Sequence, residues 1–85
     1  MTKLEEKLIE LGYEYHKLYN IWEKEILNHI IHIMLSDGQI HHNEVVNHQN
    51  IIVINQQQID NLQQAFNEMQ RDLEELKLCQ DYKKS

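Results

Sequence analysis

The apolar positions between residues 59 and 76 follow the period of an α-helix. They recur after three, four, three, four and three residues, at Ile59, Leu62, Phe66, Met69, Leu73 and Leu76. This spacing places a single apolar stripe, here called the seam, along one face of a helix. Asn55 and Gln58 have the spacing of an N-terminal cap. We therefore predict a helix over residues 56–78.

A shorter helical pattern precedes it near the start of the chain. Leu4, Leu8 and Leu11 form a narrow apolar face, and Thr2 with Glu5 has the spacing of a capping box. Gly12 directly follows this face and is suited to end a helix in the left-handed conformation. We predict a first helix over residues 3–11.

The middle of the chain is rich in β-branched and aromatic residues with short polar breaks, which is typical of strands. We predict strands within residues 19–54, in the segments YNIWEKEI, NHIIHIML, QIHHNEVV and IIVI. Asp37-Gly38 predicts a two-residue hairpin turn, because both residues tolerate positive φ. This turn predicts which residues lie opposite each other on the two strands that it joins. On the face toward the helices the pairs are Leu35 with Ile40, Ile33 with His42 and Ile31 with Glu44. On the other face they are Met34 with His41, His32 with Asn43 and Ile30 with Val45.

These elements predict one α+β domain over residues 1–85. It has two layers: a short N-terminal helix and a long C-terminal helix against a three- to four-stranded antiparallel sheet. The long helix should measure about 34 Å, whereas a typical strand spans only about 17–20 Å. The sheet therefore cannot cover the whole seam.

We place the uncovered part of the seam at Met69, Leu73 and Leu76, to be covered by the first helix, a second copy or a foreign partner. On this view Phe66→Asp unfolds the domain, whereas Leu73→Asp only weakens association. The outer sheet face, with Ile30, Met34 and Val45, is unusually apolar for a face open to water. Seam and outer face together predict a homodimer or protein-partner surface.

Charge excludes some partners. The net charge is −6, and no lysine or arginine occurs between Lys24 and Arg71. Nucleic-acid binding requires a basic stripe, so we expect no direct contact with nucleic acid. No segment approaches the ~20 apolar residues of a membrane span, and the charged N-terminal segment does not resemble a signal peptide. Cys79 is the single cysteine, so the chain cannot form an internal disulfide. Because disulfides are typical of exported proteins, we expect a cytoplasmic protein.

The chain offers little catalytic or metal-binding chemistry. Its six histidines do not converge: in the predicted register only His32 and His41 share a face, with His29 and Glu44 as a second pair on the other. We expect no metal, no cofactor and no enzymatic activity.

The acidic residues Glu68, Asp72 and Glu75 follow helical spacing beside the seam. One interpretation is a partner-binding ridge that mimics phosphates in the groove of a nucleic-acid enzyme. The other is an ordinary solvated helix face, partly neutralised by Arg71 and Lys77.

The segments LEEKLIELGYEY and IDNLQQAFNEMQRDLEELK resemble those of small, largely uncharacterised phage and prophage proteins of low-GC Gram-positive bacteria. The resemblance covers the last third of the chain and the first fifteen residues. It implies a bacterial host cell and favours an inhibitor, of the anti-CRISPR or anti-defence kind, that binds a host defence nuclease. The alternative is a self-assembling structural or scaffolding phage protein.

Overall fold

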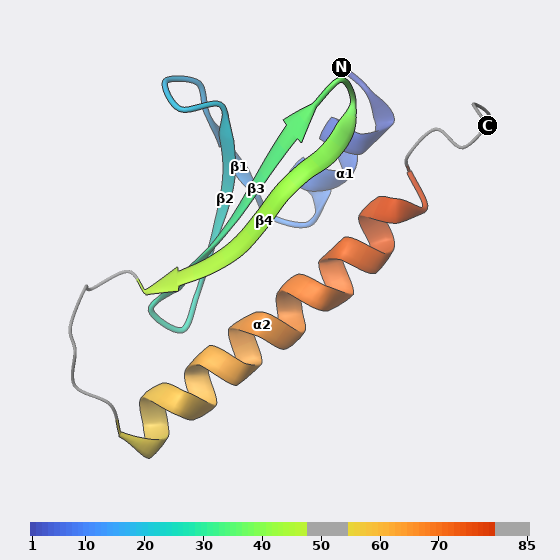
Figure 1. Cartoon of the computed structure of the whole chain (residues 1–85). Coiled ribbons are helices and arrows are strands. Elements are labelled where there is room, and N and C mark those ends of the chain that lie inside the picture. Colours follow the sequence, from blue (N-terminus) through green and yellow to red (C-terminus); the bar gives the residue numbers. More distant parts are fainter. Residues whose placement is uncertain (48–54, 80–85) are drawn as a thin grey trace.

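The computed structural model describes residues 1–47 and 55–79 and has the predicted α+β fold (Figure 1). Its helices are α1 (Lys3–Glu10) and α2 (Gln56–Lys77). The strands are β1 (Glu14–His16), β2 (Ile21–Ile26), β3 (His29–Ser36) and β4 (Gln39–Asn47). They form one antiparallel sheet in the order β1-β2-β3-β4. Strand β1 begins before the predicted range of 19–54, and the strand predicted at 51–54 lies outside the described residues.

The predicted signals at the ends of α1 are confirmed. Thr2 Oγ1 accepts from the amide of Glu5 at 3.1 Å, and Glu5 Oε1 accepts from the amide of Thr2 at 2.8 Å. At the other end Gly12 has φ +102°, and the Tyr13 amide donates to the Leu8 carbonyl at 2.9 Å. These bonds satisfy helix-end groups that would otherwise lack partners. Local sequence therefore sets both ends of α1.

Two tight turns build the β2–β3–β4 meander. Asp37 and Gly38 have φ of +55° and +76°, as the Asp-Gly signal predicts. Leu27 and Asn28 form the other turn, with φ of +50° and +69°, between the paired residues Ile26 and His29. A leucine in this conformation is strained, since its Cβ crowds the backbone.

The β3–β4 register was predicted correctly only next to the turn. Leu35 lies opposite Ile40, but the register then shifts between Met34 and Leu35, and His42 rather than His41 lies opposite Met34. One extra residue in β4 produces this β-bulge.

The shift moves every later β4 side chain to the other face. Val45 lies opposite Ile31 and packs against the core, so its predicted place on the outer face is wrong. Ile40 and Val45 both contact the core although they are an odd number of residues apart, which requires a bulge.

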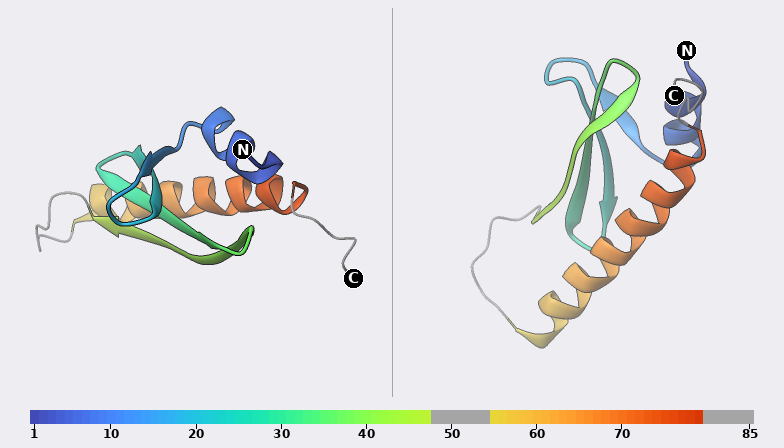
Figure 2. Two further views of the ribbon diagram at one scale, coloured as in Figure 1. Left: turned by 90° about the horizontal axis from the view of Figure 1, so that it is seen from above. Right: turned by 45° about the vertical axis from the view of Figure 1, so that its right-hand side comes forward.

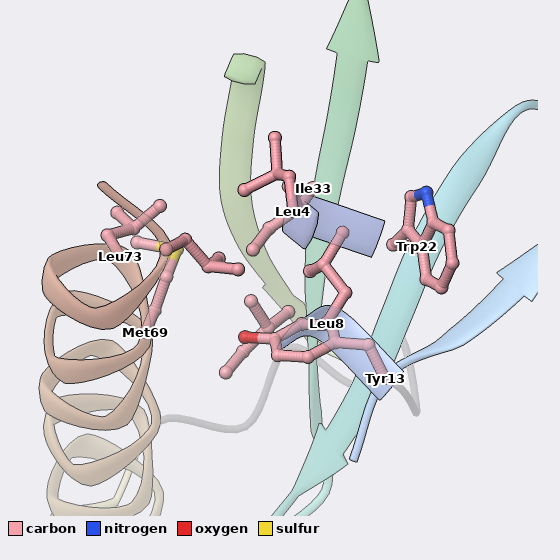
Figure 3. Close-up of a cluster of buried hydrophobic side chains, with 9 residues drawn as sticks. Leu4, Leu8, Tyr13, Trp22, Ile33, Met69 and Leu73 are labelled. Carbon is pink, nitrogen blue, oxygen red and sulfur yellow. The ribbon is translucent and has the colours of Figure 1, made fainter. Parts of the chain in front are cut away.

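Both helices pack on the same face of the sheet, with α1 beside the C-terminal half of α2 (Figure 2). The core between them contains Leu4, Leu8, Tyr13, Trp22, Ile31, Ile33, Met69, Leu73 and Leu76 (Figure 3). Met69, Leu73 and Leu76 are 3%, 9% and 0% exposed. Of the three covers predicted for these residues, the first is confirmed: α1, together with the sheet, covers them. The prediction that they form a dimer or partner seam is therefore wrong, because they are buried within their own chain.

The seam is instead uncovered at its N-terminal end, where α2 diverges from the strands (Figure 1). Ile59, Leu62 and Phe66 are 48%, 46% and 45% exposed. The predicted mismatch in length between helix and sheet is thus present, at the opposite end. These exposures change the expectation for the two variants: we now expect Leu73→Asp to unfold the domain and Phe66→Asp to leave it folded.

Candidate partner-binding surfaces

The three acidic residues proposed as a partner-binding ridge are engaged within the chain. Asp72 is 4% exposed, and its Oδ2 accepts from the Tyr13 hydroxyl and from Lys24 Nζ, each at 2.8 Å. Glu68 Oε2 lies 2.8 Å from Lys24 Nζ, and its other oxygen contacts Arg71. Glu75 lies 3.3 Å from Lys7 of α1. A continuous free acidic ridge is therefore absent among these residues.

Lys24 is the centre of this polar cluster. Its ammonium bridges β2 to two carboxylates of α2 and lies 5.2 Å from the centre of the Tyr13 ring. Burial lowers the Lys24 pKa, but hydrogen bonds to Asp72 and Glu68 outweigh it, so the net pKa is raised. Hydrogen bonds from Lys24 and, to a smaller extent, from Arg71 lower the pKa of the Glu68 carboxyl. Burial and the hydrogen bond to Asp72 raise the pKa of the Tyr13 hydroxyl. The cluster fixes α2 against the sheet.

The outer sheet face carries a network that sequence reasoning missed, here called the histidine–glutamate ladder: His16, Glu23, His32, Glu44 and His42. It crosses all four strands, with consecutive contacts of 2.8, 2.9, 3.3 and 3.5 Å. Hydrogen bonding to His32 is the largest cause of the lowered pKa of Glu44. Each imidazole faces a carboxylate, so the residues bind one another across the strands.

The bulge decides which histidines join this ladder. It brings His42 beside Glu44 and leaves His41 at the shift in register, so the predicted pairing of His32 with His41 is wrong. His29 lies buried on the inner face, with Nδ1 3.1 Å from the carbonyl of Leu27, so the predicted pairing with Glu44 is also wrong. The sequence signal for the correct face was the odd spacing of Ile40 and Val45.

Ile30 and Met34 lie on the outer face as predicted, since they pair with Val46 and His42 and flank His32 along β3. Both are partly exposed. They form an apolar margin to the ladder.

A groove with largely apolar lining lies between β4 and the uncovered part of the seam. This groove has a volume of about 560 Å³. Its lining residues are Asn43, Glu44 and Val45 of β4 and Leu62, Gln63, Phe66, Met69 and Gln70 of α2. Leu62 and Phe66 supply exposed apolar area, and the amides of Asn43, Gln63 and Gln70 supply hydrogen-bonding groups. Aromatic side chains are enriched in protein interfaces relative to the rest of the protein surface.

No family model, curated protein or solved structure matches this chain significantly.

Within residues 1–47 and 55–79, no three histidine, cysteine, aspartate or glutamate side chains are placed to hold one metal ion. In the same residues, neither helix is long and apolar enough to span a bilayer.

Proposed function

We propose that this protein acts by binding another protein, without catalysis of its own, and that the groove between β4 and the N-terminal half of α2 is its main contact surface. The observation that supports this most is the exposure of Ile59, Leu62 and Phe66, each close to half exposed along one helix face. Exposed apolar side chains gathered beside a groove are typical of interfaces.

The resemblance of both ends of the chain to small phage proteins supports a more specific proposal. The protein is an inhibitor of a host defence nuclease in the cytoplasm of a low-GC Gram-positive bacterium, and it blocks the nuclease by stoichiometric binding. The internal neutralisation of Glu68, Asp72 and Glu75 argues against phosphate mimicry by these residues. Apolar contact through the groove replaces it in this proposal.

A matched pair of variants tests the surface. Phe66→Asp places a charge in the groove, and Ile9→Asp places one at a similarly exposed position, 50% against 45%, on α1. Tagged wild-type protein and both variants are used to capture proteins from a low-GC Gram-positive lysate, and each captured nuclease is then titrated with the purified chains. We expect capture and inhibition by the wild type and Ile9→Asp and loss of both in Phe66→Asp. Equal behaviour of the two variants would exclude the groove.

The scaffolding alternative keeps one supporting observation, namely that β4 is the last strand of the sheet formed by the described residues and lies beside the same groove. A scaffold would self-assemble and capture no host protein. The same captures, combined with light scattering of the purified protein, separate the two functions.

A further inference from the structure

We infer that the groove receives a second copy of this chain, bound edge to edge through β4 in a two-fold antiparallel pair centred on Asn43. The inference rests on the proposed function only in taking the groove as a protein-binding surface. It names the occupant, and it holds or fails whether or not a host nuclease is bound.

The first support is the free edge of the sheet. In the order β1-β2-β3-β4, strand β4 has β3 on one side and no strand of the described residues on the other. It is nine residues long and contains neither lysine nor proline, the residues that commonly protect an edge. The bulge lies near its start, so residues 42–46 pair regularly with β3 and present a regular edge. Such an edge is a template for another strand.

The second support is charge complementarity along β4. In a two-fold antiparallel pair centred on Asn43, His42 of each copy lies directly opposite Glu44 of the other. Opposite residues share a face, with Cβ atoms about 4.5–5.5 Å apart, which suits an imidazole donating to a carboxylate. Centring on Glu44 would oppose two carboxylates, and centring on His42 would oppose two imidazoles. The sequence of β4 thus favours the Asn43 register, which forms two complementary pairs.

The third support is the position of the apolar groove. Asn43 lines the groove together with Leu62 and Phe66, so these two side chains lie close to the proposed two-fold axis. The symmetry places both α2 helices on one face of a continuous eight-stranded sheet. Leu62 and Phe66 of one copy then meet the same residues of the other, which removes the exposed seam from water. One closed arrangement satisfies both the strand edge and the seam.

Complementary variants test the register. His42→Glu leaves glutamate at positions 42 and 44, so its homodimer opposes carboxylates twice. Glu44→Lys leaves histidine and lysine there, so its homodimer lacks any carboxylate. Mixed in equal amounts, the two chains restore an acid–base pair at both contacts. His16→Glu is the matched control, because it makes the same substitution beside Glu23 at the opposite edge of the same face.

Sedimentation equilibrium and light scattering of each purified chain give the dissociation constants, with circular dichroism to confirm folding. We expect the wild type and His16→Glu to be dimers. In His42→Glu and in Glu44→Lys the affinity of the homodimer should fall at least about tenfold, or ~1.4 kcal/mol. The mixture of these two variants should recover the wild-type affinity. Phe66→Asp should be a folded monomer. A wild-type monomer at about 100 µM, well above the micromolar range of modest specific affinities, would overturn the inference. Failure of the mixture to recover would overturn the register.

The two proposals fail separately. A monomer that still captures a nuclease through the groove retains the proposed function and rejects the second copy. A dimer with the expected variant pattern that captures no host protein retains the second copy and favours the scaffolding alternative.

Discussion

The substitution Lys24→Met tests the polar cluster that fixes α2 to the sheet. Lys24 and Asp72 are 12% and 5% exposed at their side chains, and the methionine keeps much of the volume of the lysine stem. It leaves Asp72 charged and buried, with the Tyr13 hydroxyl as its one remaining partner within residues 1–47 and 55–79. The cost therefore arises from the remaining carboxylate rather than from lost packing.

The magnitude follows from burial. Removing one partner of a buried ion pair costs about 3–5 kcal/mol. Glu68 keeps Arg71 and partial exposure, so it adds little, and we expect a loss of about 3 kcal/mol for the variant. A chain of this size has about 4–13 kcal/mol of stability at ~0.05–0.15 kcal/mol per residue, so the loss is a large fraction.

The double variant Lys24→Met with Asp72→Asn provides the control. The asparagine introduced at position 72 is neutral and its side-chain carbonyl can still accept from Tyr13, so we expect the double variant to recover to within about 1 kcal/mol of wild type. Urea unfolding followed by circular dichroism measures both. A single variant within about 0.5 kcal/mol of wild type, the range of ordinary surface changes, would show that Lys24 does not stabilise the buried carboxylate. So would a double variant as unstable as the single one.

Burial, backbone conformation and pKa give three further predictions. Leu73→Ala should lower the free energy of unfolding by about 2–4 kcal/mol, because Leu73 is buried. Phe66→Ala should lower that of the monomer by less than about 1.5 kcal/mol, because Phe66 is 45% exposed. Equal losses in urea unfolding would contradict this difference in burial. Leu27→Asn should raise the free energy of unfolding by about 1 kcal/mol, because asparagine tolerates the φ of +50° better than leucine does. Little packing is lost, since Leu27 is 45% exposed. An unchanged melting temperature would reject strain at this turn. The pKa of Glu68 is lowered in the folded state, mainly by Lys24, so its stabilisation is complete above the unfolded value of 4.5 and is lost as pH falls through the folded pKa. Glu68→Gln should therefore be less stable than the wild type at neutral pH, and it should lose less stability than the wild type as the pH falls. Free energies of unfolding measured for both chains across pH 3–7 test this.

Local signals predicted the ends of the elements well. The Thr2–Glu5 capping box, Gly12 and Asp37-Gly38 each act through bonds or φ values within a few residues, and all three behave as predicted. The type and extent of α2 also follow from a periodic pattern that is long enough to be unambiguous.

The register of β4 is harder to read, because one bulged residue inverts every later side chain. The histidine-rich stretch does not indicate by itself which residue is extra. The spacing of Ile40 and Val45 carried the signal, and it gains meaning only when both residues are required in the core. The same inversion accounts for the histidine–glutamate ladder that the sequence analysis missed.

The uncovered end of the seam depends on long-range packing. The length mismatch follows from helix and strand geometry, but the place where α1 docks does not. Leu4 and Leu8 join the core beside Leu73 and Leu76, and Lys7 contacts Glu75, so α1 covers the C-terminal half of α2. The six apolar positions of the seam look alike in the sequence, and only this docking makes Phe66 exposed and Leu73 buried.

In the proposed dimer the β4 edge of one copy meets the same edge of the other at Asn43. In a two-fold pair this residue lies opposite itself, at a Cα separation of about 4.5–5.5 Å, which a disulfide can bridge. The decisive measurement is the yield of disulfide-linked dimer from Asn43→Cys in a Cys79→Ser background under mild oxidation, compared with His16→Cys at the opposite edge. We expect near-complete linkage at position 43 and little at position 16, whereas equal or slower linkage at position 43 would rule out this edge-to-edge dimer.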